Sequence, residues 1–143
     1  MKKNGFSLIE MLLVIGLITI LAVGSISLWR NNKNRIIFNQ TKDDVLLALE
    51  KARSRAETGY GINAHGVSCD GSKLTVFEKD CGSSCQNNFD ILLPASVNLN
   101  PSNFSIIFSR ITAQTGADTN ITISGTGKTT VISIKKDGTI VEN

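Results

Sequence analysis

The chain has 143 residues, with 15 lysines and arginines against 12 aspartates and glutamates and a formal net charge of +3 at pH 7. This length allows one domain beside an N-terminal segment. The near-balance of charge argues against a broad electrostatic surface for nucleic acid, and six Phe, one Tyr and one Trp argue against a disordered chain.

The chain begins with a short basic stretch, Lys2-Lys3-Asn4, followed by an apolar run from Phe6 to Leu28 in which Glu10 is the only charge. As a helix, a run of this length is sufficient to cross a bilayer core of about 30 Å. On insertion scales an acidic side chain at the centre of such a helix costs roughly 2.5–3.5 kcal/mol, so the position of Glu10 indicates a function.

A second helical pattern follows the polar residues 30–35. Apolar residues recur there at helical spacing, namely Phe38, Val45, Leu49, Ala52 and Ala56, and Gly59 is a suitable C-terminal stop. We therefore expect one long helix from residue 6 to about residue 58, softened by Gly and Ser near 24–34. Its apolar half and its amphipathic half must face different surroundings.

Beyond Gly59 the apolar residues alternate with a period of two. Residues 73–78, 104–109, 120–124 and 129–135 indicate strands, and Asp137-Gly138 predicts a hairpin turn. Residues 66–88 are rich in Gly, Ser, Asn and Cys and indicate a loop around a short strand. The fold class is therefore α+β: a long N-terminal helix, with an apolar transmembrane half and an amphipathic half, packed on antiparallel β-sheet.

Two conventional explanations of the N-terminal segment leave features unused. A signal peptide would use the basic start, the apolar stretch and the small residues Ala22-Val23-Gly24 as a cleavage site, which would release a soluble β-protein. A plain signal anchor would need only the apolar run. Neither explanation accounts for Glu10 or for Gly5-Phe6 at the boundary between polar and apolar residues.

Residues 2–23 resemble the type III signal of prepilins, the precursors of type IV pilins and pseudopilins. The resemblance lies in the basic leader, Gly5, Phe6 and the run Ser7-Leu8-Ile9-Glu10-Met11-Leu12 before an apolar helix. It implies that a prepilin peptidase cuts between Gly5 and Phe6, that the new amino group of Phe6 is methylated, and that the helix joins a filament core. Glu10 would then face the ammonium group of Phe6, either on a neighbouring subunit or one turn away in its own chain.

The second half of the helix is similar to H-type minor pseudopilins of type II secretion and related minor pilins, through Ala52-Arg53-Ser54-Arg55-Ala56. The resemblance implies a leader peptide (1–5), a transmembrane and assembly helix (6–29) and a globular pilin domain (30–143). That domain would comprise an amphipathic helix (36–58) and an antiparallel β region (60–143). It also implies a non-enzymatic protein that spans the bacterial inner membrane once, with the globular domain on the periplasmic side, before it enters a pilus or pseudopilus. Its partners would be the prepilin peptidase, other pilin subunits, the inner-membrane assembly platform and, before assembly, membrane lipid.

Three cysteines, Cys69, Cys81 and Cys85, lie close together in the sequence. In an exported protein they would form one disulfide and leave one thiol over, and the sequence does not choose among the three pairings. Free thiols are the second interpretation. His65 adds a fourth soft ligand, so zinc bound by His65, Cys69, Cys81 and Cys85 is the third, although we expect neither a metal nor another cofactor.

No catalytic constellation emerges from the sequence, because a Ser/His or Cys/His site would depend on the single histidine. Residues 123–130, ISGTGKTT, look like a phosphate loop, but Thr122 stands where the first glycine belongs and a strand follows instead of a helix. Lys128, Lys135 and Lys136 form a candidate basic patch. They support the alternative function, a DNA-binding competence-type minor pilin, although an ordinary charged strand surface explains them as well.

Overall fold

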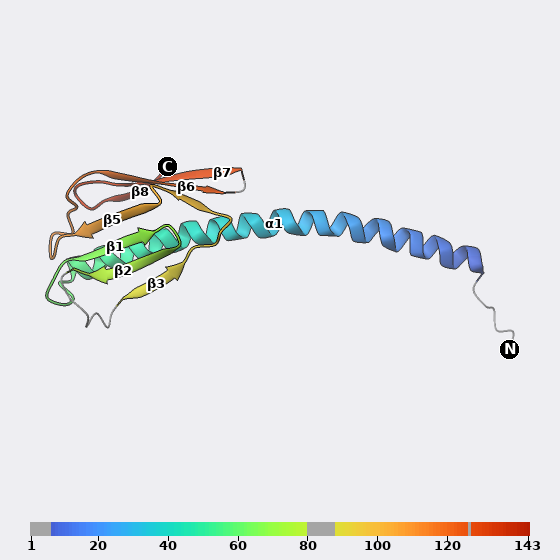
Figure 1. Ribbon diagram of the computed structural model, residues 1–143, viewed down its shortest axis with the longest axis horizontal. Helices are drawn as coiled ribbons and strands as arrows, with labels where there is room; N and C mark the ends of the chain where they lie inside the picture. The colour runs from blue at the N-terminus through green and yellow to red at the C-terminus, as the bar shows by residue number, and fades with distance from the viewer. Residues whose placement is uncertain (1–6, 80–87, 126) are drawn as a thin grey trace. The chain divides into compact units, whose positions relative to one another are not determined.

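The computed structural model describes residues 7–79, 88–125 and 127–143 and, within these, the side chains of all residues except 23–31. Its described elements are a helix, α1 (Leu8–Glu57), and the strands β1 (His65–Asp70), β2 (Lys73–Glu78), β3 (Phe89–Leu92), β4 (Asn98–Asn100), β5 (Asn103–Phe108), β6 (Thr119–Gly125), β7 (Lys128–Ile134) and β8 (Ile140–Glu142) (Figure 1). The chain forms two compact units, Met1–Arg35 and Ile36–Asn143, and α1 contributes residues to both.

The second unit is an α+β domain with two antiparallel sheets. One sheet has the strand order β3-β2-β1-β5 and the other has the order β4-β6-β7-β8. Both sheets bury one face against the part of α1 that belongs to this unit (Figure 1). The predicted fold class, a helix packed on antiparallel β-sheet, is confirmed.

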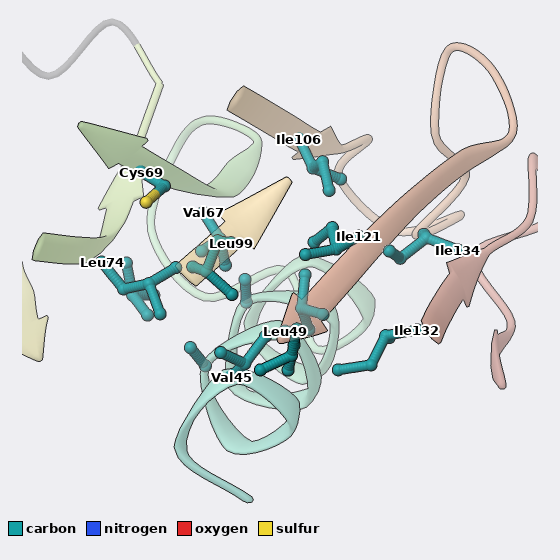
Figure 2. Close-up of a cluster of buried hydrophobic side chains, with 14 of the residues drawn as sticks. Val45, Leu49, Val67, Cys69, Leu74, Leu99, Ile106, Ile121, Ile132 and Ile134 are labelled. Carbon is teal, nitrogen blue, oxygen red and sulfur yellow. The ribbon is translucent and has the colours of Figure 1, made fainter. Parts of the chain in front are cut away.

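The core of this unit is built around the apolar stripe of α1. All five stripe residues predicted from the sequence are buried, namely Phe38, Val45, Leu49, Ala52 and Ala56. Figure 2 shows Val45 and Leu49 of α1 among core side chains from both sheets, which include Val67, Leu74, Ile106, Leu99, Ile121, Ile132 and Ile134. The small residues Ala52 and Ala56 leave room for the sheets to approach the helix closely.

The four strands predicted from alternation are present as β2, β5, β6 and β7, each within about one residue of its expected bounds. The predicted hairpin joins β7 to β8, and the N–H of Gly138 donates to the carbonyl of Lys135 at 2.8 Å. Gly138 adopts a positive φ of 83° at this turn, a conformation that favours glycine. β6 and β7 pair antiparallel with Gly125 opposite Lys128, so a strand and not a helix follows the sequence that looks like a phosphate loop.

The expectation of mostly loop for residues 66–88 is wrong at its start. Residues 65–70 form β1, which pairs with β2 on one side and β5 on the other and is therefore an interior strand. Gly66 lies in this strand because a Cβ atom there would approach the carbonyl oxygen of Ile106 to 2.6 Å. The glycine that suggested a loop thus allows close pairing of two strands.

Candidate functional site

The first described turn of α1 contains Glu10. The carbonyl of Ser7 accepts hydrogen bonds from the N–H groups of Glu10 at 3.1 Å and Met11 at 3.2 Å, which places Ser7 at the N-cap and Glu10 at the third helical position. The pattern Ser-x-x-Glu is that of a capping box, in which the glutamate supports the start of the helix. Its negative charge also lies at the positive end of the helix dipole. Sequence reasoning did not consider this pattern, although the spacing of Ser7 and Glu10 signals it.

The first unit presents apolar side chains around the whole helix rather than along one stripe. Between residues 8 and 21 the exposed large apolar residues are Leu8, Ile9, Met11, Leu12, Leu13, Val14, Ile15, Leu17, Ile18, Ile20 and Leu21. Their exposed fractions range from 45% for Val14 to 78% for Leu8. Within the described residues, no helix meets the length and hydropathy of a membrane span.

The predicted processing residues Gly5 and Phe6 lie outside the described residues, as do Cys81 and Cys85. Cleavage between Gly5 and Phe6 and the choice of cysteine pairing therefore remain predictions. The described part of the chain begins directly after Phe6, at Ser7, and α1 begins one residue later.

Cys69 and His65 lie on the same strand, β1, and both are buried. Cys69 forms no disulfide with any residue that the structure describes, and it lies at the edge of the core (Figure 2). Its sulfur accepts a hydrogen bond from the N–H of Gly71 at 3.4 Å. Burial raises the pKa of the Cys69 thiol above its ordinary value. This environment stabilises the protonated, unreactive form of the sulfur.

The zinc hypothesis needs His65 and Cys69 at one metal ion. Residues four apart on a strand have Cα atoms about 13 Å apart and parallel side chains. Zinc ligands lie only about 2.0–2.3 Å from the metal, so β1 does not bring these two side chains together as ligands of one ion. The described residues also contain no group of three or more potential metal ligands.

His65 instead belongs to a cluster of polar contacts at the end of α1. Its Nε2–H donates to the carbonyl of Tyr60, while no partner for Nδ1 lies in the described part of the chain. Glu78 faces it across the β1–β2 pair and accepts hydrogen bonds from the N–H groups of Ile62 at 3.0 Å and Asn63 at 3.1 Å. These bonds hold the pKa of Glu78 below its ordinary value, that from Asn63 contributing most. The cluster attaches the connection between helix and sheet to β2.

The three lysines of the candidate basic patch lie at the two ends of β7. Lys128 begins β7, whereas Lys135 and Lys136 follow its other end, and a strand of seven residues is roughly 23 Å long. All three side chains are exposed, but the N–H of Lys136 donates to the carboxylate of Asp118, so acidic charge lies beside this pair. The geometry therefore does not favour a single cationic surface for DNA.

Comparison with known proteins identifies the N-terminal segment. Residues 1–26 match the family model described as the prokaryotic N-terminal methylation motif. No curated protein and no solved structure matches the chain. The resemblance to prepilins is thus confirmed for this segment, while the similarity to H-type minor pseudopilins stays a prediction. The chain carries the type IV prepilin signature, which indicates a type IV pilin-like precursor that is processed by prepilin peptidase and assembles with other pilin subunits.

Proposed function

We propose that the protein is a minor structural subunit of a type IV pilus or of a type II secretion pseudopilus. The match of residues 1–26 to the N-terminal methylation motif is the observation that carries the proposal. The family to which this motif points is structural and non-enzymatic. In the proposed subunit, the β-sheet domain faces the periplasm and meets partners, and the N-terminal helix holds the subunit in the membrane and then in the filament.

The exposed apolar residues of α1 support assembly through this helix. In the described part of the chain, eleven large apolar side chains between residues 8 and 21 are at least 45% exposed. Hydrophobic free energy favours their transfer from water into lipid or against neighbouring helices. In the proposal, residues 6–29 span the inner membrane before assembly and pack against other subunits afterwards.

Cleavage before Phe6 gives Glu10 a charged partner. The new α-amino group has a reference pKa of about 7.7–8.0 and carries a positive charge through most of the neutral range. An ammonium group from a neighbouring subunit offsets the cost of burying the Glu10 carboxylate and fixes the axial register between the two helices. The capping-box pattern of Ser7 and Glu10 concerns the isolated chain, whereas the ammonium pair needs a neighbouring subunit, so the two proposed functions can be separated experimentally.

The first test is the intact mass and N-terminal sequence of protein purified from cells that contain a prepilin peptidase. We expect a chain that begins at Phe6 and is heavier by one methyl group. The variant Gly5→Leu is the matched control and should retain Met1. A chain that begins at Ser25 would show a secreted domain, and a wild-type chain that retains Met1 would show an unprocessed anchor; either result contradicts the proposal.

The function of Glu10 is tested with two substitutions that differ in one property. Glu10→Ala removes both the charge and the capping group, whereas Glu10→Gln keeps a side chain that can cap and removes only the charge. We expect both variants to be cleaved and methylated normally and both to be depleted from sheared filament or pseudopilus fractions. Wild-type incorporation of Glu10→Gln would show that capping, not pairing with an ammonium group, is what the filament requires.

A further inference from the structure

Three exposed apolar side chains lie at the end of the second unit where α1 stops. They are Tyr60, Ile62 and Ile111, with exposed fractions of 49%, 86% and 66%, and Ile62 is the most exposed large apolar residue of the described chain. The N–H of Ile111 donates to the carbonyl of Ala56 at 2.7 Å, so the loop after β5 lies against the last turn of α1 (Figure 1). This contact brings the loop and the connection from α1 to β1 to one surface.

Ile111 adopts a backbone conformation that its side chain opposes. Its φ of 74° lies in the left-handed region, where a β-branched residue is a genuine outlier. The backbone N–H alone makes the bond to Ala56, so a glycine would make the same bond without strain. The isoleucine side chain is 66% exposed and therefore adds little to the core. Folding does not account for isoleucine here, which indicates that the side chain acts outside its own chain.

Two exposed cations flank these apolar side chains. The Nη2 of Arg110 donates to the carbonyl of Gly59 at 3.4 Å, and the N–H of Lys79 donates to the carbonyl of Ala64 at 2.8 Å, on the connection that carries Ile62. Both cationic side chains are exposed. Neither forms an ion pair with any residue that the structure describes.

The acids near this surface are already bound. The carboxylate of Glu57 accepts a hydrogen bond from the Nε of Arg53 at 2.9 Å, and Glu78 accepts the two backbone N–H groups described above. The charged residues around the surface comprise four cations and two anions, a net charge of +2: Arg53, Arg55, Lys79, Arg110, Glu57 and Glu78. The surface therefore presents apolar side chains in a positive environment, which fits a partner with negative charge over an apolar interior.

The exposure of these side chains favours a bilayer over a protein as that partner. A side chain that is 86% exposed, like that of Ile62, projects from the surface and lines no hollow. A protein partner must supply a shaped hollow for each projecting side chain, whereas the boundary between headgroups and acyl chains accepts single apolar side chains at any position. Tyrosine is enriched at this boundary, and cations are attracted to anionic headgroups, so Tyr60 and Arg110 fit the same environment.

We propose that Tyr60, Ile62 and Ile111, flanked by Arg110 and Lys79, dock on a membrane surface that carries anionic lipid headgroups. The two isoleucine side chains enter the boundary of the acyl chains, and the two cations contact phosphate groups of the lipids. The inference goes beyond the proposed function and does not depend on it, because these residues lie in the second unit and the apolar segment of α1 takes no part.

The test measures whether the full chain, held in one membrane, captures a second membrane. The chain is reconstituted into immobilised vesicles of phosphatidylcholine, and fluorescent vesicles of phosphatidylcholine with phosphatidylglycerol are added at equal amounts of bound protein. We expect Ile62→Ser combined with Ile111→Gly to lower the captured fluorescence about tenfold, because two apolar side chains no longer insert. Leu92→Ser, which removes an 80% exposed leucine on β3, is the matched control and should capture like the wild type.

Ile111→Gly alone separates binding from folding. It removes the side chain together with the backbone strain, so we expect a melting temperature higher by a few degrees and a capture that is several-fold lower. Capture by the wild type should also fall several-fold between about 0.1 M and 1 M salt, where the screening length falls from about 10 Å to about 3 Å.

Four results overturn the inference. They are capture by the wild type no greater than by protein-free vesicles, equal capture by the wild type and the double variant, unchanged capture by Ile111→Gly, and equal capture of fluorescent vesicles made of phosphatidylcholine alone. The first of these results would assign the exposed side chains to a protein partner instead.

Discussion

The two halves of α1 differ in how their apolar residues are distributed and in what surrounds them. Between residues 8 and 21, large apolar side chains are at least 45% exposed, whereas Val45, Leu49, Ala52 and Ala56 are completely buried. In the second half the chain supplies its own partners, because two sheets cover one stripe of the helix. In the first half the apolar residues surround the helix, and no segment of the described chain covers them. A helix that is apolar on all sides requires partners or lipid from outside its own chain.

The largest expected effect is the loss of a core leucine from the amphipathic half of α1. Leu49→Ala should lower the free energy of unfolding by about 2–5 kcal/mol, because it removes a fully buried side chain and leaves a cavity. Leu47→Ala, two residues away and 53% exposed, is the matched control and should change it by less than about 0.5 kcal/mol. Chemical unfolding of the full chain in mild detergent, followed by circular dichroism, measures both. Equal losses would mean that the burial of this stripe does not determine the stability of the domain.

Two glycines provide a second contrast between the units. Gly66→Ala should cost about 1–3 kcal/mol of unfolding free energy, because the added methyl group meets the carbonyl of Ile106 at 2.6 Å and strands β1 and β5 must separate. Gly16→Ala meets nothing within 4 Å among the residues that the structure describes and should leave unfolding unchanged or slightly favour the helix. Filament incorporation sharpens the comparison: if a neighbouring helix packs on Gly16, this variant assembles poorly although its chain is stable.

The parts of the fold that follow from local pattern were predictable. The helical stripe from Phe38 to Ala56 and the strands rich in β-branched residues repeat with a clear period, so their identity does not depend on distant residues. β3 and β4 have only four and three residues, too few to show a period. β1 was missed because Gly66 and its polar neighbours suggest a loop, and the reason for that glycine lies in β5, about forty residues along the chain.

The candidate sites, like the fold, were predictable only where they depend on residues that are close in the sequence. The processing segment was recognisable because its residues are consecutive, and Ser7 and Glu10 interact across one turn. The lysine patch stays a prediction, and the length of β7 between Lys128 and Lys135 does not favour a single surface. The contact of Glu78 with Ile62 and Asn63 was not predictable, since the register of β1 on β2 creates it.

The smallest effect concerns that contact, which fixes the end of α1 to the sheet. The pKa of Glu78 lies below its ordinary value of 4.5, so its ionised form stabilises the folded state above that pH. This contribution is lost as the pH falls through the lowered pKa of the folded state. Glu78→Gln should therefore lower the melting temperature of the full chain by a few degrees at pH 7, and the difference from the wild type should shrink below about pH 4.5.

The matched control for this substitution is Glu50→Gln, an exposed position on α1 without an ion pair among the described residues. It should leave the melting temperature unchanged at both pH values when the protein is kept dilute in detergent. A pH-independent difference for Glu78→Gln would show that the carboxylate does not stabilise the connection through its charge. In that case His65 and the hydrogen bonds of the helix end alone would hold the amphipathic half in place, and the contrast with the apolar half would depend on packing alone.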